Sequence, residues 1–326
     1  MNNILRYFPE KLRSVLNEEI ENKYDSLEEI RIRVEKPIVF KFNTIEKVVR
    51  YVVNKDEILN ILQLVCENSI YTYQNQISEG FVTIDGGHRV GITGSCVIEN
   101  GKVININYIN SLNFRISRQV IGCSLEIIKH ILNKEENTVF NTLIVSPPGA
   151  GKTTLLRDIV RQVSSGIKTL KFKGITVGVV DERGEIGALY KGAPQNDIGI
   201  KTDVIENVPK NIGMRMLIRS MAPQVMVADE IGNSEDVDAI NYVMCSGCKG
   251  IFTAHGASFD DIYMNPILKN LINIHIFEVI VFLDTKEKGK AKEILLLDKK
   301  NSQYEKYQEK VENPIDINEN IVGAKI

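Results

Sequence analysis

Two patterns of apolar and polar positions divide the chain. In residues 29–34, apolar side chains alternate with arginines, which is typical of a strand buried on one face only. The second part instead has continuous apolar runs separated by helical segments, the pattern of parallel strands covered on both faces. These patterns predict a small α+β domain over residues 1–125, an α/β domain over residues 126–310 and a loosely ordered polar tail over residues 311–326. Ser124 can cap the helix at the domain boundary.

Two local signatures in the first domain predict specific geometry. Asn54 followed by Glu57 is close to a capping box, which predicts the start of a helix. Between two alternating apolar segments, Asp85-Gly86-Gly87 predicts a hairpin turn. We expect this turn to place His88 and Arg89 where both could reach a neighbour.

Residues 141–156, NTLIVSPPGAGKTTLL, combine an apolar run, a Gly/Pro-rich loop and a helix-forming segment. They predict a phosphate-binding loop of the Walker A type. Gly149 and Gly151 let backbone N–H groups turn toward a phosphate at the helix N-terminus. Lys152 would place its charge on the β- and γ-phosphates of ATP, and Thr153 would give its hydroxyl to Mg²⁺. The residues expected to contact the nucleotide are Ser146, Pro147, Pro148, Gly149, Ala150, Gly151, Lys152, Thr153 and Thr154.

An apolar strand at residues 225–228 ends in Asp229-Glu230 after the phosphate loop, which is the form of a Walker B segment. Asp229 would hold Mg²⁺ through the metal's water shell. Glu230 would polarise the attacking water, and we favour it as the general base.

An earlier buried strand ends in a second acidic cluster, residues 181–185, and the carboxyl ends of parallel strands form the ligand-binding edge of such a sheet. Glu182 and Glu185 in this cluster are alternative candidates for the general base. A fourth buried strand ends near His255, which would lie in register with the other strand ends and could sense the γ-phosphate.

Composition narrows the range of functions. The 326 residues carry 40 Lys+Arg against 42 Asp+Glu, a net charge of −2, so the chain has no overall basic field of the kind that favours nucleic-acid binding. Residues 275–283 form the longest apolar stretch, which is too short and too polar to span a bilayer, and the N-terminus lacks a signal peptide's apolar core. Five irregularly spaced cysteines fit reduced thiols. We therefore expect a cytoplasmic protein.

The order of motifs resembles the secretion-type ATPases that drive type II and type IV export and pilus assembly, and within that group its sporulation members. The segments that carry the resemblance are EIRIRVEKPIVF, GFVTIDGGHRVGITG, SPPGAGKTTLLRDIVR, VVDERGEIGA, GMRMLIRSMAPQVMVADEIG and TAHG. It implies a RecA-like core behind a small N-terminal domain, a hexameric ring and a motor that docks on membrane-anchored channel proteins. For the sporulation members it implies work at the channel between mother cell and forespore. Ser146 departs from the pattern, which has a glycine there.

The expected function is a Mg²⁺-dependent ATP hydrolase that converts hydrolysis into subunit motion in a ring. One alternative is a RecA-like nucleic-acid motor, and another is an ATP-binding assembly scaffold without turnover. A nucleotide at the edge of an open sheet has one side uncovered, so an arginine from an adjacent subunit should complete the site. We expect Arg89 to be that arginine. The other candidates are Arg31, Arg33 and Arg115 of the first domain and Arg215 and Arg219 of the second.

Overall fold

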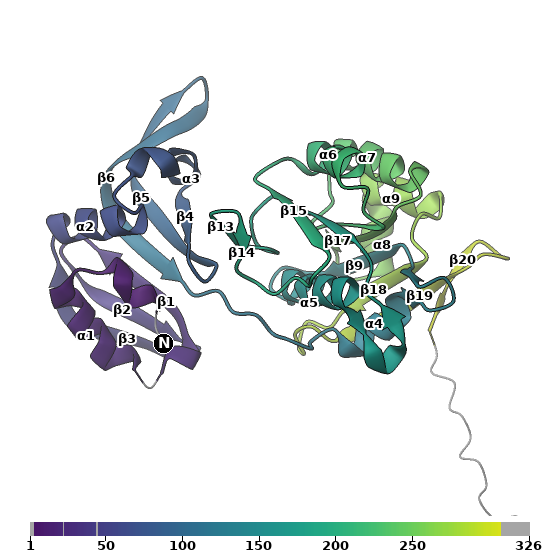
Figure 1. Ribbon diagram of the computed structural model, residues 1–326, viewed down its shortest axis with the longest axis horizontal. Helices are drawn as coiled ribbons and strands as arrows, with labels where there is room; N and C mark the ends of the chain where they lie inside the picture. Colours follow the sequence, from purple (N-terminus) through teal and green to yellow (C-terminus); the bar gives the residue numbers. More distant parts are fainter. Residues whose placement is uncertain (1–2, 22, 44, 308–326) are drawn as a thin grey trace, which may run out of the picture.

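The computed structural model describes residues 3–21, 23–43 and 45–307. Two lobes are connected by a segment without regular secondary structure, residues 116–124 (Figure 1). No helix within the described residues is long and apolar enough to cross a membrane.

The first lobe is built on a six-stranded antiparallel sheet with the strand order β3-β2-β1-β6-β5-β4. Its elements are η1 (Asn3–Tyr7), α1 (Glu10–Ile20), η2 (Tyr24–Ser26), β1 (Leu27–Arg33), β2 (Lys36–Phe42), β3 (Ile45–Val53), α2 (Lys55–Val65), η3 (Ile70–Tyr73), α3 (Gln74–Ser78), β4 (Phe81–Ile84), β5 (His88–Glu99) and β6 (Lys102–Arg115).

Local sequence explains several of these elements. In β1 the isoleucines at 30 and 32 are fully buried and the arginines between and after them are exposed, as their alternation predicts. The predicted capping box at the start of α2 is confirmed: Asn54 Oδ1 accepts from Glu57 N at 2.9 Å, and Glu57 Oε2 accepts from Asn54 N at 2.9 Å. The predicted hairpin is confirmed as well, since β4 and β5 pair across Asp85-Gly86-Gly87.

The second lobe is built on an eight-stranded sheet with the order β15-β12-β16-β17-β9-β18-β19-β20, in which β19 and β20 run antiparallel to their neighbours. Its elements are α4 (Leu125–Ile131), β7 (Leu132–Asn133), β8 (Thr138–Val139), β9 (Thr142–Ser146), α5 (Lys152–Ser165), β10 (Gly166–Ile167), η4 (Lys168–Leu170), β11 (Phe172–Lys173), β12 (Val177–Asp181), β13 (Leu189–Tyr190), β14 (Ala193–Pro194), β15 (Thr202–Glu206), α6 (Lys210–Ser220), β16 (Val225–Ala228), α7 (Ser234–Cys245), β17 (Lys249–His255), α8 (Phe259–Met264), α9 (Pro266–Asn273), β18 (Val279–Leu283), β19 (Ala291–Asp298) and β20 (Gln303–Lys306).

Helices cover both faces of this sheet (Figure 1). Ile144 of β9 packs into a core with residues of α4 and α5, whereas Leu143 and Val145 pack into a second core with residues of α6 to α9. Every residue of β9 is buried, as the continuous apolar run predicts. Strand β17 lies between β9 and β16. The predicted class is therefore confirmed: an α/β core with a mainly parallel sheet follows a small α+β lobe.

Two sequence-based expectations were wrong. Ser124 does not cap α4 with its side chain, because its hydroxyl donates to the buried carboxylate of Asp158 on α5 at 2.7 Å. His88 does not reach outward, since its ring is buried between Tyr24 and Ser117: its Nδ1 accepts from Ser117 N at 3.0 Å. Burial lowers the pKa of the His88 imidazole.

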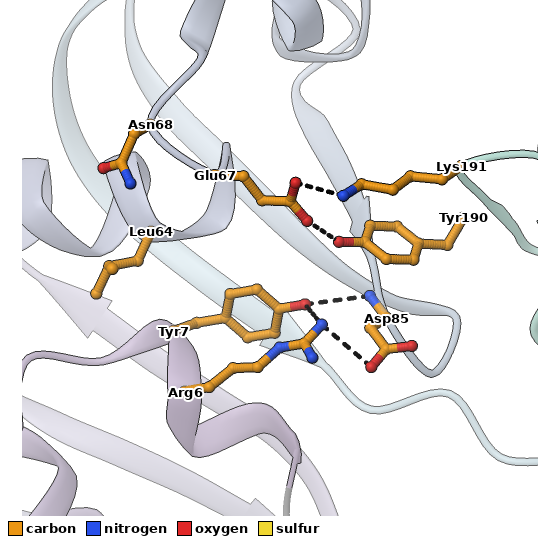
Figure 2. A pocket seen from close by; sticks show the side chains of 8 residues that line it. All are labelled: Arg6, Tyr7, Leu64, Glu67, Asn68, Asp85, Tyr190 and Lys191. Carbon is orange, nitrogen blue, oxygen red and sulfur yellow. Dashed lines mark hydrogen bonds and ion pairs between the residues drawn. The ribbon is translucent and has the colours of Figure 1, made fainter.

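The contacts between the lobes are largely polar. Figure 2 shows the carboxylate of Glu67 in the first lobe facing both Tyr190 and Lys191 of the second, with an ion pair of 2.5 Å to Lys191. On the other side of the same cavity, Arg6 pairs with Asp85 at 3.1 Å within the first lobe. The hydrophobic core of the first lobe is separate from the two cores of the second lobe. Ion pairs and hydrogen bonds, rather than a shared apolar core, therefore connect the lobes at this cavity.

Candidate functional site

The predicted phosphate-binding loop joins β9 to α5. Gly149 and Gly151 adopt φ of 78° and 93°, left-handed values that favour glycine. The loop curls so that Lys152 Nζ donates to the carbonyl of Ser146 at 3.1 Å. Ser146 itself is fully buried, and its hydroxyl donates to the Pro147 carbonyl at 2.9 Å. The serine at the usual glycine position is thus accommodated without a lost hydrogen bond.

Lys152 is the central cation of the site. Burial lowers the pKa of its ammonium group, and the charges of Asp229 and Glu230 oppose that effect. Its Nζ lies 3.4 Å from Nδ1 of His255, which pairs in register with the first residue of the loop across β17 and β9. The predicted lysine, histidine and Walker B carboxylates therefore meet at one edge of the sheet.

A hydroxyl and a carboxylate form the candidate metal site. Thr153 Oγ1 donates to Asp229 Oδ2 at 2.6 Å, although the two residues are 76 positions apart. Thr253 donates to the other carboxylate oxygen of Asp229, which fixes its orientation. Hydroxyl and carboxylate oxygens are hard donors of the kind that Mg²⁺ prefers, so this donor set fits the ion.

Glu230 has an unusual backbone and two polar partners. Its φ is 54°, a left-handed value that is uncommon outside glycine. Its N–H donates to Thr253 Oγ1 at 2.8 Å. Its carboxylate forms an ion pair with Arg183, with Oε2 2.6 Å from Nη1, and its Oε1 lies 3.2 Å from His255 Nε2. The side chain is held beside the metal site from two directions.

The acidic loop after β12 is organised by Asp181. Its carboxylate accepts backbone N–H groups of Glu185, Ile186 and Gly187 at 2.7, 2.9 and 2.8 Å, which makes it the centre of the turn. A small cavity at the site is lined by Asp181, Glu182, Arg183, Glu185, Lys210, Asp229 and Glu230. The carboxylates of this loop thus share one cavity with the Walker B pair.

The two alternative bases have different partners. Glu182 pairs with Lys210, the first residue of α6. Glu185 pairs with Arg89 of the first lobe at 2.8 Å, so its carboxylate points toward the lobe boundary.

Arg89 is bound within its own chain. Besides Glu185, it donates to the carbonyl of Arg183, and its guanidinium lies 4.8 Å from the ring centroid of Phe81. The expected contact of Arg89 with an adjacent subunit stays a prediction, and it would require these bonds to open.

Four functional candidates were missed by the sequence reasoning. Arg183 lies inside the acidic cluster of residues 181–185, in which only the carboxylates were considered as candidates. Thr253 lies two residues before His255, at a strand end that was already a candidate part of the site. No sequence pattern indicates a functional role for Lys210. The same holds for Arg157, a buried residue of α5 that donates to the Glu185 carbonyl at 2.7 Å.

Known proteins share sequence similarity with this chain over most of its length. Residues 1–303 match the family described as sporulation stage III, protein AA. Stage III sporulation protein AA of Bacillus subtilis (strain 168) is 38% identical over 278 residues, which cover 85% of this chain and 89% of that protein. The protein SEEDLING PLASTID DEVELOPMENT 1 of Arabidopsis thaliana is 31% identical over 165 residues, 49% of this chain and 22% of that protein.

Solved structures share the fold at low identity. The ATPase DotB of Legionella pneumophila superposes with a TM-score of 0.55 at 15% identity, over 88% of this chain and 81% of that chain. The pilus retraction motor PilT with bound ADP superposes with a TM-score of 0.53 at 15% identity, over 81% and 76% of the two chains. The resemblance expected from the motifs is confirmed. The family match over residues 1–303, together with the 38% identity to the Bacillus protein, shows that this chain belongs to the stage III sporulation protein AA family.

Proposed function

We propose that this chain is a Mg²⁺-dependent ATP hydrolase. The observation that carries the proposal is the contact of 2.6 Å between Thr153 Oγ1 and Asp229 Oδ2, which joins a phosphate-loop hydroxyl to a strand-end carboxylate. Lys152 lies next to the first of these residues and Glu230 next to the second. Phosphoryl transfer depends mainly on positioning and charge neutralisation, which this set of groups supplies.

In the proposed reaction, water attacks the γ-phosphorus of ATP. The bond from that phosphorus to the β–γ bridging oxygen breaks, its electron pair stays with ADP, and inorganic phosphate is released. Glu230 accepts the proton of the attacking water and passes it to the phosphate or to solvent. Lys152 neutralises charge on the β- and γ-phosphate oxygens. Mg²⁺, held by Thr153 and through water by Asp229, would add further neutralisation.

The cellular role follows from family and fold. The ATPase DotB and the pilus retraction motor PilT share this fold, and the family is named for stage III of sporulation. We infer a cytoplasmic motor that works as a homo-oligomeric ring at a channel between mother cell and forespore. Membrane-anchored channel proteins are the partners this role requires.

The decisive experiment measures phosphate release by the purified chain with ATP and Mg²⁺. Wild type should release phosphate, and Lys152→Ala should lose both ATP binding and turnover because the charge facing the phosphates is gone. Lys168→Ala, which alters an exposed lysine in η4, is the control. Unchanged ATP affinity in Lys152→Ala would contradict the phosphate-loop assignment.

The same assay separates the alternatives. ATP binding without phosphate release would favour the assembly scaffold. Filter binding of single-stranded nucleic acid, repeated at two salt concentrations, tests the nucleic-acid motor, for which affinity should fall steeply with salt.

A further inference from the structure

The candidate base is bound by a cation of its own chain. Arg183 Nη1 lies 2.6 Å from Glu230 Oε2, and His255 Nε2 lies 3.2 Å from Oε1. A general base must present a carboxylate oxygen to the water that it deprotonates. A guanidinium at this distance competes with that water, so the contact with Arg183 has to open before Glu230 can act.

Arg183 is suited to change partners. Its side chain is 65% exposed, whereas that of Glu230 is 23% exposed, so the arginine can move with little loss of packing. Its charge also reaches Lys152, since it is among the causes that lower the pKa of the Lys152 ammonium group. The guanidinium is therefore within electrostatic range of both the candidate base and the lysine that would face the phosphates.

The backbone that carries this side chain is fixed. Arg89 donates to the Arg183 carbonyl, Gly184 adopts a left-handed φ of 60°, and Asp181 accepts three consecutive N–H groups beyond it. A fixed backbone with a long, exposed side chain favours movement of the arginine alone, without rearrangement of the loop.

We propose that Arg183 exchanges the Glu230 carboxylate for the γ-phosphate of ATP, and so frees the base only when a γ-phosphate is present. The inference rests on the proposed function. A phosphate group offers a guanidinium more charge and more acceptor oxygens than one carboxylate does, so it competes effectively for Arg183. ADP offers no γ-phosphate, and the pair between Arg183 and Glu230 would persist with it.

The test is a double-mutant cycle read by nucleotide affinity, with fluorescent ribose-labelled ATP and ADP as probes. Glu230→Gln removes the charge that competes for the arginine, so it should tighten ATP binding about three- to tenfold, with ADP binding unchanged. In the Arg183→Gln background, Glu230→Gln should leave the affinity for ATP unchanged. Arg183→Gln alone should weaken ATP binding about tenfold relative to ADP. Arg50→Gln, at an exposed arginine of β3, is the matched control.

The outcomes separate this inference from the proposed function. If wild type binds no ATP, both are overturned. If wild type binds and hydrolyses ATP but Glu230→Gln changes ATP affinity equally in both backgrounds, Arg183 only stabilises the loop and the exchange is overturned. Coupling that appears with ATP and not with ADP supports the exchange, and thermal unfolding of each variant confirms that the fold is intact.

Discussion

At the scale of single residues, cation partners distinguish three candidate carboxylates. Glu182 binds Lys210, Glu185 binds Arg89 and Glu230 binds Arg183, but only Glu230 directly follows the candidate metal ligand Asp229. Thr253 connects the Walker B pair, because its hydroxyl donates to Asp229 and accepts from the Glu230 N–H. Position next to the metal site therefore favours Glu230 as the base.

Glu230→Gln should retain ATP binding and lower phosphate release by roughly 10²–10⁴. The amide keeps the shape of the side chain and leaves Asp229 in place, but it cannot accept the proton. Steady-state phosphate release and equilibrium ATP binding measure the two effects. Glu182→Gln and Glu185→Gln are the comparisons, and loss of turnover in either of them without loss in Glu230→Gln would move the base into the acidic loop.

Glu206, the last residue of β15, should make the free energy of unfolding depend on pH. Burial, followed by the charge of its strand neighbour Asp181, raises the pKa of the Glu206 carboxyl to about 7. The stability that its neutral form contributes is complete below the ordinary pKa of 4.5 and is lost as the pH rises toward 7.

Glu206→Gln should therefore stabilise the protein relative to wild type at pH 8 and not at pH 4.5, by on the order of 1–2 kcal/mol after allowance for partial exposure. Urea unfolding across this pH range measures the difference. Asp203→Asn, on the same strand, is the control, and a pH-independent difference would contradict the assignment.

At the scale of elements, helix α5 connects the phosphate loop to the segment between the lobes. It begins at Lys152, and its fully buried Asp158 accepts from the N–H groups of Gly122 and Ser124 at 3.0 and 2.9 Å. Its neighbour Arg157 donates to the Arg118 carbonyl at 3.1 Å. One helix thus holds the predicted nucleotide site and the start of the second lobe together.

Asp158→Ala should destabilise the protein by about 3 kcal/mol or more, because it leaves several buried donors unpaired. Those donors include the Ser124 hydroxyl, Arg161 and Gln162. Urea unfolding measures the loss, with the exposed Glu126→Ala on α4 as the control. A change in the free energy of unfolding below about 1 kcal/mol would show that water takes over the hydrogen bonds of the Asp158 carboxylate.

At the scale of the whole molecule, Arg89 has two candidate roles, one in its own chain and one toward an adjacent subunit of the proposed ring. Arg89 connects the first lobe to the acidic loop through Glu185 and the Arg183 carbonyl. A guanidinium that reaches the γ-phosphate of an adjacent subunit can contribute roughly 10³–10⁵ in rate. The two roles differ in whether the arginine serves its own site or a neighbour's.

Mixing two inactive variants tests the second role. Arg89→Ala and Lys152→Ala should each lack turnover, and rings that contain both should regain some wherever an intact arginine meets an intact phosphate loop. Phosphate release from mixtures at several ratios measures the recovery, and native mass spectrometry verifies co-assembly. No recovery in co-assembled rings would assign Arg89 to its own chain and direct the search to Arg31 and Arg33.

The sequence by itself determined most of the fold. The period of apolar positions indicated the strands, the capping box located α2, and residues 149–153 indicated the phosphate loop, because each depends on backbone geometry over a few adjacent residues. The assignment of Lys152, Thr153 and Asp229 to nucleotide and metal remains a prediction, as does the domain boundary near residue 125.

Only the tertiary structure decided which charged groups meet. Arg183 pairs with Glu230, Lys210 with Glu182, and the Ser124 hydroxyl turns from its helix to a distant carboxylate. These partners come from segments far apart in the chain, and strand order and helix packing bring them together. A side chain's preference for an opposite charge is visible in the sequence, but the choice among many such charges depends on distance, which the fold alone sets.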